Sequence, residues 1–352
     1  MSGNNTFHQA TLDDLQHYLT SQGNSFNVYP SEDIPVGQNA QLRCPFGYRE
    51  NIVHLNQNKS RKTIRLPKTD YHISKLLREV QIYNSCQHPN ILHFDGISFN
   101  LNSTDNFIEL SFFSPQIWGS LKRFLNLGQS ADISQYLPLG VGVNEIKQKI
   151  IFGISAGLLY LSSKKIVIKN LNYESILLDD QFNPLLSDFE LSYLDDPNIM
   201  GENYHSICES LIESPEVWKI CYSGDPLSVD YHKAIQSEQS IIFSWGVLIN
   251  SILGKPFYPF GGLPDISEFY CNDRRPQLIE QYPLYRNLIS KGFKKDPNER
   301  PTPIEIIINL LRDEAMLPNV NISRIKEYQK LALTPFFISL SDDHHDDGTE
   351  SN

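Results

Sequence analysis

The spacing of apolar residues changes about one third of the way along this chain. The first part contains short apolar runs that are typical of β-strands, with one helical pattern among them. From Asn144 onward the apolar residues recur every three or four positions, as in helices that bury one face. A strand-rich part followed by a helix-rich part favours an α+β fold in two parts. The strand-like runs are Asn51–Leu55, Thr63–Leu66, Ile91–Phe94 and Phe107–Phe113, and the helical patterns are Ile73–Tyr83, Ile146–Leu161, Ser240–Leu253, Tyr285–Gly292 and Pro303–Arg312.

Composition excludes two classes of partner. The chain has 352 residues, of which 40% are hydrophobic, so it can bury a sizeable core in one large domain or two lobes. Its formal net charge of −11 disfavours nucleic acid, because phosphate backbones select basic surfaces. The most apolar run, Ile304–Leu311, is too short to cross a bilayer and is interrupted by polar residues. We therefore expect no nucleic-acid partner and no membrane association.

The cysteines and the first residues bear on location. Five cysteines at wide spacing, without a CxxC pair, predict reduced intracellular thiols rather than disulfides or a zinc site. The first nine residues lack the apolar segment of a signal peptide. We expect a cytoplasmic protein, with a nuclear location as the alternative.

Both ends of the chain differ from its middle. Residues 1–40 form a polar leader, in which Leu12, Leu15 and Leu19 have the spacing of a short amphipathic helix. We favour packing of this helix on the main domain over a dedicated partner-binding role. Residues 313–352 form a C-terminal extension, and its acidic tail is expected to be disordered because it is strongly charged and polar.

Nine short motifs follow one another between residues 42 and 312. Each is a weak signal alone, because short patterns also occur by chance. In chain order they are Lys62–Pro67 (KTIRLP), Glu79 within LLREV, His88–Leu92 (HPNIL), Gly119–Leu125 (GSLKRFL), Ile168–Asp179 (IKNLNYESILLD), Ser187–Glu190 (SDFE), Ser214–Glu216 (SPE), Phe243–Leu248 (FSWGVL) and Asp296–Pro301 (DPNERP).

The order of these motifs resembles that of the protein kinases, nearest to the tyrosine-kinase-like group. The resemblance implies an α+β, two-lobed fold. A small β-rich N-lobe with one main helix is expected over about residues 41–113, and a larger helical C-lobe over about residues 114–312. It also implies ATP and Mg²⁺ as ligands. Activity needs separate evidence, because one fold hosts many functions.

Several positions that carry the chemistry of kinases are changed in this chain. The catalytic aspartate is replaced by Asn170, which cannot take up a proton, and the metal-binding asparagine is replaced by Ser175, whose hydroxyl is a shorter and weaker ligand. Glu190 stands where a glycine follows the metal-binding Asp188, which is itself retained. Asp188 and Ser175 are therefore the expected Mg²⁺ ligands, and no intact catalytic base is expected.

The lysine of the nucleotide site is assigned to Arg65, which lies in the apolar strand pattern. Glu79, 14 residues further on, resembles its ion-pair partner on the main helix of the N-lobe. Lys62 and Lys68 are alternatives to Arg65. Arg65, Glu79 and Asp188 are thus the residues expected to face a nucleotide.

The loop that covers the phosphates in kinases is also changed. If Gly47 is its last glycine, Leu42 and Cys44 occupy the two earlier glycine positions, and their side chains would obstruct the approach of backbone amides to phosphates. Ile168 and Ile241 stand where the family has polar residues that support the catalytic loop.

Residues with a structural role are better preserved. Glu216 and Arg300 match the pair that forms a buried salt bridge in the large lobe of kinases. Intact structural positions beside altered catalytic ones predict a pseudokinase that acts as a scaffold or an allosteric partner of an active kinase or another signalling protein. Such a protein requires no cofactor. Two alternatives stay open: an atypical ATP-dependent protein kinase, and a switch that binds ATP, with or without Mg²⁺, without transferring phosphate.

Overall fold

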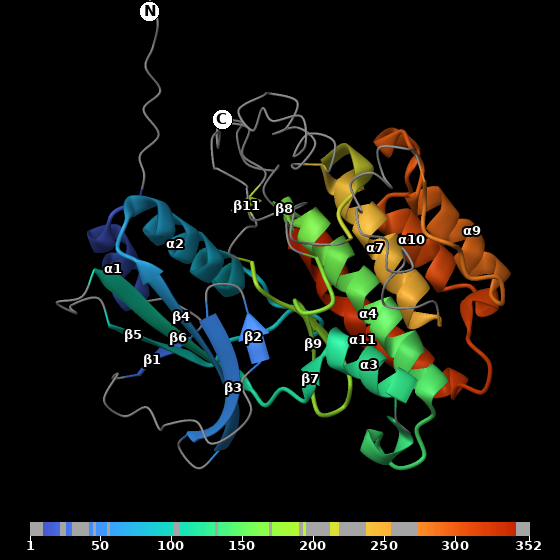
Figure 1. Ribbon diagram of the computed structural model, residues 1–352, viewed down its shortest axis with the longest axis horizontal. Coiled ribbons are helices and arrows are strands. Elements are labelled where there is room, and N and C mark those ends of the chain that lie inside the picture. The colour runs from blue at the N-terminus through green and yellow to red at the C-terminus, as the bar shows by residue number, and fades with distance from the viewer. Residues whose placement is uncertain are drawn as a thin grey trace, which may run out of the picture.

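The chain folds into a sheet-rich lobe and a helical lobe that share one continuous hydrophobic core (Figure 1). This arrangement confirms the α+β, two-lobed fold expected from the sequence. The computed structural model describes residues 10–21, 26–29, 42–44, 47–54, 57–100, 106–130, 133–168, 171–189, 193–194, 212–217, 237–254 and 274–342.

A six-stranded sheet forms the small lobe. Its strand order is β1-β5-β6-β4-β3-β2, parallel between β1 and β5 and antiparallel elsewhere. The long strand β4 is paired along both sides, so its inward side chains are held in a fixed position. The bounds are β1 Asn27–Val28, β2 Leu42–Cys44, β3 Gly47–His54, β4 Gln57–Pro67, β5 Gly96–Asn100 and β6 Phe107–Pro115.

Helix α2 (Asp70–Ser85) covers this sheet, and helix α1 (Leu12–Thr20) packs against α2. Thr69 caps the start of α2, because its side chain accepts a hydrogen bond from a backbone N–H of the first turn. In α1, Leu15 and Leu19 are completely buried. The predicted leader helix is therefore confirmed, and its apolar face packs on the main domain.

The large lobe is built around helix α4 (Val143–Ser163), which is buried over most of its length. Helices α7, α10 and α11 pack on it, and α9 packs on α7 (Figure 1). The other bounds are β7 Gly119–Ser120, α3 Leu121–Ser130, η2 Ile133–Tyr136, β8 Ile166–Val167, β9 Ile176–Leu178, β10 Pro184–Leu186, β11 Tyr193–Leu194, α7 Glu238–Ile252, α9 Pro283–Gly292, η4 Pro297–Glu299, α10 Pro303–Leu310, η5 Asp313–Ala315 and α11 Ile322–Asp342.

Helix α11 continues the large lobe beyond the predicted limit at residue 312. The Asn90 side chain donates a hydrogen bond of 2.6 Å to the Tyr328 hydroxyl of α11. His88 Nδ1 accepts the Asn90 backbone N–H at 3.0 Å, so its Nε2–H donates to the Ala332 carbonyl at 2.8 Å. A Cβ on Gly153 of α4 would lie 2.3 Å from the Tyr328 hydroxyl, so this close approach requires glycine. His88 therefore lies in a turn that its own side chain caps, and that turn joins α2 to α11.

Two expectations about the sequence elements need correction. The apolar run Ile91–Phe94 forms only an isolated bridge, from Ile91 to Leu186, and the strand follows it as β5. The small lobe also begins before residue 41, since α1 and β1 both belong to it. The acidic residues that follow Asp342 lie outside the described part of the chain.

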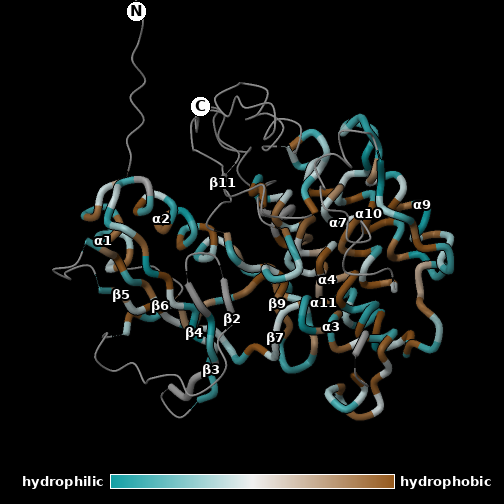
Figure 2. Tube along the Cα trace, viewed as in Figure 1, coloured by the Kyte–Doolittle hydropathy of each residue, from teal (hydrophilic) through white to brown (hydrophobic). Residues whose placement is uncertain are grey.

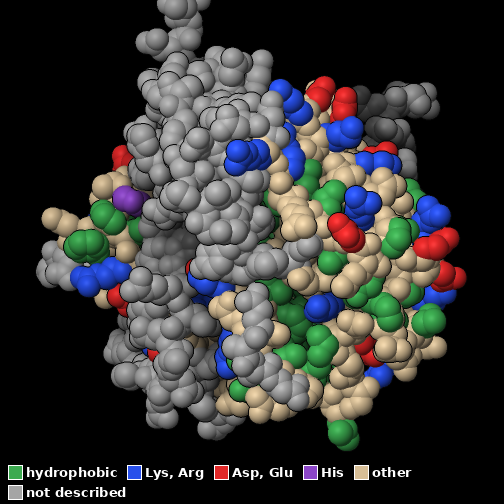
Figure 3. All heavy atoms as spheres, turned by 45° about the vertical axis from the view of Figure 1, so that its right-hand side comes forward, with side chains coloured by type: hydrophobic (Ala, Val, Ile, Leu, Met, Phe, Trp, Pro, Cys, Tyr) green, Lys and Arg blue, Asp and Glu red, His purple; other side chains and the backbone are tan. Residues whose placement is uncertain are grey.

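Apolar segments run through the interior of the helical lobe, around α4 and α7 (Figure 2). On the face of this lobe that Figure 3 shows, the coloured positive and negative side chains are interspersed. None of the helices in the described ranges is both long and apolar enough to cross a membrane.

Candidate functional site

The candidate site lies where β4, α2 and the segment after β10 meet. Lys62 of β4 places its Nζ 2.8 Å from Glu79 Oε1 of α2. The same Nζ lies 2.8 Å from Asp188 Oδ1. The side chains of Lys62 and Glu79 are completely buried, and that of Asp188 is 3% exposed. One ammonium group therefore joins the sheet, the helix and the metal-loop acid.

The sequence assignment of Arg65 to this position is wrong. Side chains alternate between the two faces of a strand, so residues three apart on β4 point to opposite faces. Lys62 points into the protein, whereas Arg65 is exposed and its guanidinium lies 4.8 Å from the ring centroid of Phe107. Lys62, one of the two alternatives, is the partner of Glu79. The other alternative, Lys68, is exposed.

Arg49 of β3 was not identified from the sequence, and it belongs to the same cluster. It is paired directly opposite Lys62 in the ladder, so both side chains point to the same face of the sheet. Its Nη2 lies 3.5 Å from Asp188 Oδ1, and the side chain is 2% exposed. Neither Nη1 nor Nη2 makes a hydrogen bond to another residue that the structure describes. Its position two residues after Gly47, directly after the predicted phosphate loop, could have identified it.

The electrostatics of the cluster follow from its burial. Desolvation raises the pKa of the Glu79 carboxyl, and the Lys62 ammonium opposes this rise through its charge and its hydrogen bond. Burial also raises the pKa of the nearby Tyr83 hydroxyl well above its usual range, and the charge of Glu79 adds to that rise. Tyr83 is therefore a neutral hydroxyl that can donate and accept hydrogen bonds.

Tyr83 fixes the backbone of the metal loop. Its hydroxyl accepts the Asp188 backbone N–H at 2.8 Å, and its ring packs against Phe189 with 4.9 Å between centroids. Asp188 has a φ of 63°, a left-handed conformation that residues other than glycine seldom adopt. Surrounding contacts must hold such a residue in place. Helix α2 thus acts on Asp188 in two ways: Glu79 binds the same lysine as Asp188, and Tyr83 binds the backbone of Asp188.

The residues predicted to bind Mg²⁺ do not fit that ion in this structure. Asp188 Oδ1 already faces two cations, Lys62 and Arg49. The Ser175 hydroxyl is turned into its own loop, where it accepts the Asn172 N–H at 2.9 Å and donates to the Asn172 carbonyl at 3.2 Å. Mg²⁺ requires several oxygen ligands in octahedral geometry. In the described ranges, no group of three or more His, Cys, Asp or Glu residues could hold a metal ion.

Two further predicted positions, Asn170 and Glu190, lie outside the described residues. The supporting positions Ile168 and Ile241 are buried and line the same cavity of about 390 Å³. Aliphatic side chains make no hydrogen bonds, so these two residues stabilise the loop by packing alone. Of the phosphate loop, the backbones of Leu42, Cys44 and Gly47 form the β2–β3 hairpin.

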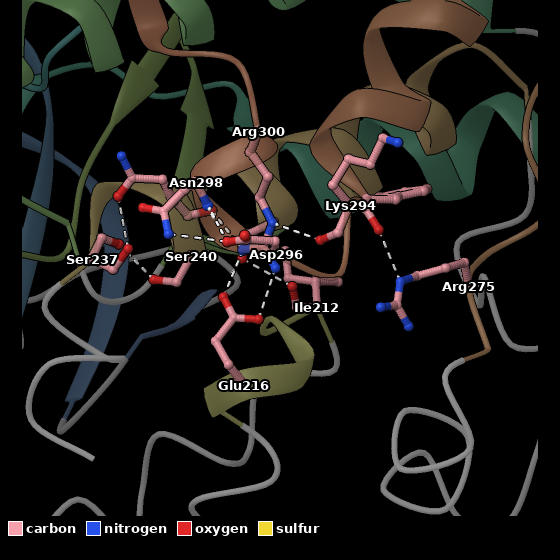
Figure 4. A network of polar contacts seen from close by, with 12 residues as sticks. Ile212, Glu216, Ser237, Ser240, Arg275, Lys294, Asp296, Asn298 and Arg300 are labelled. Carbon is pink, nitrogen blue, oxygen red and sulfur yellow. Dashed lines mark hydrogen bonds and ion pairs between the residues drawn. The ribbon is translucent and has the colours of Figure 1, made fainter. Parts of the chain in front are cut away.

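Glu216 and Arg300 form the expected salt bridge in the large lobe (Figure 4). The contact is bidentate, with Arg300 Nη1 to Glu216 Oε1 at 2.6 Å and Nη2 to Oε2 at 2.8 Å. Arg300 also donates to the carbonyls of Gln239 and Lys294, so its buried guanidinium is well satisfied. The pair links the Ser214–Glu216 motif to the loop before α10.

Comparison with known proteins agrees with this geometry. The protein tyrosine and serine/threonine kinase family matches residues 60–310, more than half of the chain. Similar proteins include the serine/threonine-protein kinase fray1 of Dictyostelium discoideum, 25% identical over 87% of this chain and 49% of fray1. The probable serine/threonine-protein kinase kinY of the same organism is 24% identical over 91% of this chain and 54% of kinY.

A mammalian protein matches a shorter part. The dual specificity testis-specific protein kinase 2 of Mus musculus is 25% identical over 74% of this chain and 42% of its own length. The chain thus spans about half the length of the curated relatives that it matches. On the family match and the buried cluster of Lys62, Glu79 and Asp188, the chain belongs to the protein tyrosine and serine/threonine kinase family.

Proposed function

We propose that this chain is a pseudokinase, a kinase-fold protein that works by binding other signalling proteins rather than by transferring phosphate. The observation that carries the proposal is the state of Asp188. Its carboxylate faces both Lys62 and Arg49, and the Ser175 hydroxyl is engaged by its own loop. Phosphoryl transfer depends on metal ions that neutralise the charge on the phosphates, and these residues do not provide a site for them.

The sequence of the catalytic loop supports the same proposal. Asn170 occupies the position of the general base, and an amide cannot accept the proton of a substrate hydroxyl. General-base catalysis typically contributes a factor of about 10² to 10⁴ in rate. Loss of the base and of the metal site together would leave little transfer.

The intact scaffold is consistent with a binding role. Lys62–Glu79 joins the sheet to α2, and Glu216–Arg300 braces the large lobe. A rigid kinase fold can present its surfaces to an active kinase or to another signalling protein without performing chemistry. We further propose a cytoplasmic location, on the basis of the cysteine pattern described above.

A second candidate is an atypical ATP-dependent kinase for serine, threonine or tyrosine. One observation favours it: the lysine lies within ion-pair distance of both the helix glutamate and the metal-loop acid. Under this candidate, substrates like those of the longer relatives are proposed for this chain.

A transfer assay separates the two candidates. The purified chain is incubated with γ-labelled ATP and Mg²⁺ or Mn²⁺, with generic protein substrates and by itself, beside the Asp188→Ala variant. We expect no label above that of the variant. Label that requires Asp188 would refute the pseudokinase proposal and support the second candidate. Affinity capture from the native cell, followed by identification of bound kinases and signalling proteins, tests the binding role.

A further inference from the structure

The position of Arg49 suggests what this site binds. We propose that the Arg49 guanidinium takes the place of the divalent cation at Asp188, and that the site binds the phosphates of a nucleoside triphosphate without metal. This inference concerns the same site as the proposed function and rests on it, but binding and transfer are measured separately.

The first argument is charge. Among the described residues, the cluster contains two cations, Lys62 and Arg49, and two carboxylates, Glu79 and Asp188. Their formal charges cancel. Without Arg49 the three remaining groups would carry one net negative charge in a buried site, which an external cation would have to balance. Arg49 therefore supplies from within the chain the charge that a metal would otherwise bring.

The second argument is hydrogen bonding. Nη1 and Nη2 of Arg49 are buried and make no hydrogen bond within the described part of the chain, although a buried polar group normally has a partner. The contact with Asp188 is 3.5 Å long, an ion pair rather than a hydrogen bond. A planar guanidinium can donate two parallel hydrogen bonds to a phosphate, which makes arginine well suited to such ligands. Phosphate oxygens would therefore satisfy donors that have no hydrogen-bond partner among the described residues.

The third argument concerns the metal. An added divalent ion at Asp188 Oδ1 would share one carboxylate oxygen with Lys62 and Arg49. Like charges in a buried site repel strongly, because little water screens them. The ion would have to displace one of the two cations. The site therefore disfavours a metal ion, whereas the Arg49 donors remain available to phosphate oxygens.

The test is a calorimetric and thermal-shift titration of the full chain with ATP in excess EDTA, with ATP and Mg²⁺, and with Mg²⁺ alone. We expect ATP in EDTA to bind and to raise the melting temperature, because a ligand of the folded state stabilises it. Mg²⁺ alone should bind weakly or not at all, and its addition should not tighten ATP binding.

Substitution of Arg49 identifies the group responsible. Arg49→Met should weaken metal-free ATP binding by roughly tenfold or more, the usual effect of losing a hydrogen bond to a charged group. It should also make ATP binding depend on Mg²⁺. Arg49→Lys should keep part of the metal-free affinity, and Arg65→Met, on the opposite face of β4, should change nothing.

Absence of ATP binding in EDTA would overturn the inference, as would an unchanged metal-free affinity in Arg49→Met. The first of these needs only the wild-type chain, so a variant that fails to fold does not protect the inference. Phosphate transfer in the assay above would instead overturn the proposed function, even if ATP binds without metal. The two failures are thus distinguishable.

Discussion

Replacement of Lys62 by methionine tests the central assignment of the site. Methionine has a similar length and no charge, so Lys62→Met removes the ammonium while keeping most of the apolar contact. The matched control is Arg65→Met, which removes a cation from the exposed face of the same strand. The sequence pattern alone had placed the functional cation at the control position.

The structure sets the expected magnitudes. Lys62 is completely buried and contacts two carboxylates, each at 2.8 Å. Removal of one partner from a buried ionic cluster typically costs about 3–5 kcal/mol of unfolding free energy, because buried charges lose their compensation. Arg65 is exposed and contacts the ring of Phe107, an interaction worth about 1 kcal/mol or less. We therefore expect a difference of about 2–4 kcal/mol between the two variants.

Urea unfolding at a series of pH values measures this difference. Burial raises the pKa of Glu79 above its ordinary value of 4.5, and loss of Lys62 removes the main opposing influence. A raised carboxyl pKa in the folded state costs stability above that pKa and ceases to cost as the pH falls toward 4.5. The deficit of Lys62→Met should therefore shrink as the solution is acidified. Equal losses in Lys62→Met and Arg65→Met, with unchanged urea m-values, would refute the assignment.

Three further predictions concern the scaffold. Glu216→Gln should lower the unfolding free energy by about 3 kcal/mol, because it leaves the buried Arg300 guanidinium without its counter-ion. The control Glu299→Gln removes a carboxylate from an exposed ion pair and should lower the unfolding free energy by less than about 1 kcal/mol in the same denaturation assay. Burial lowers the pKa of His88 to about 4, below the 6.5 of an unfolded histidine. The unfolding free energy should therefore fall by up to about 3 kcal/mol as the pH drops from 6.5 to 4. If the dependence of the unfolding free energy on pH is the same in His88→Gln, this assignment is wrong. Leu15→Ala should lower the unfolding free energy by about 2–5 kcal/mol and speed amide hydrogen exchange in α2. Leu12 is only partly buried, so Leu12→Ala should lower it less. Equal exchange rates in the two variants would argue against the packing of α1 on α2.

Much of the fold could be predicted because it depends on local patterns. The helical spacing from Ile146 to Leu161 corresponds to α4, and the strand-like run at Phe107–Phe113 lies within β6. Helix α11 was missed, although Ile325, Tyr328 and Ala332 have helical spacing and are all buried. The acidic residues that follow give this end of the sequence the composition of a disordered tail.

The candidate site could be predicted only in part. Glu79 and Asp188 were identified from motifs whose residues are adjacent in the chain. The sequence assigned the site cation to Arg65, three positions after Lys62, because an apolar pattern tolerates charged residues on either face of a strand. Arg49 was missed entirely, since its relation to Asp188 joins two segments far apart in the sequence.

The sequence by itself indicated a strand-rich part followed by a helix-rich part, because periodicity is a local property of a chain. Its motifs, in an order that resembles protein kinases, implied the two lobes and the Glu216–Arg300 pair. Tertiary structure decided which cation meets Glu79 and what Asp188 contacts. Both depend on the register of β4 against β3 and on the packing of α2, which bring Lys62 and Arg49 to one buried carboxylate. Because these groups are buried, their charges must be compensated within the protein instead of by water.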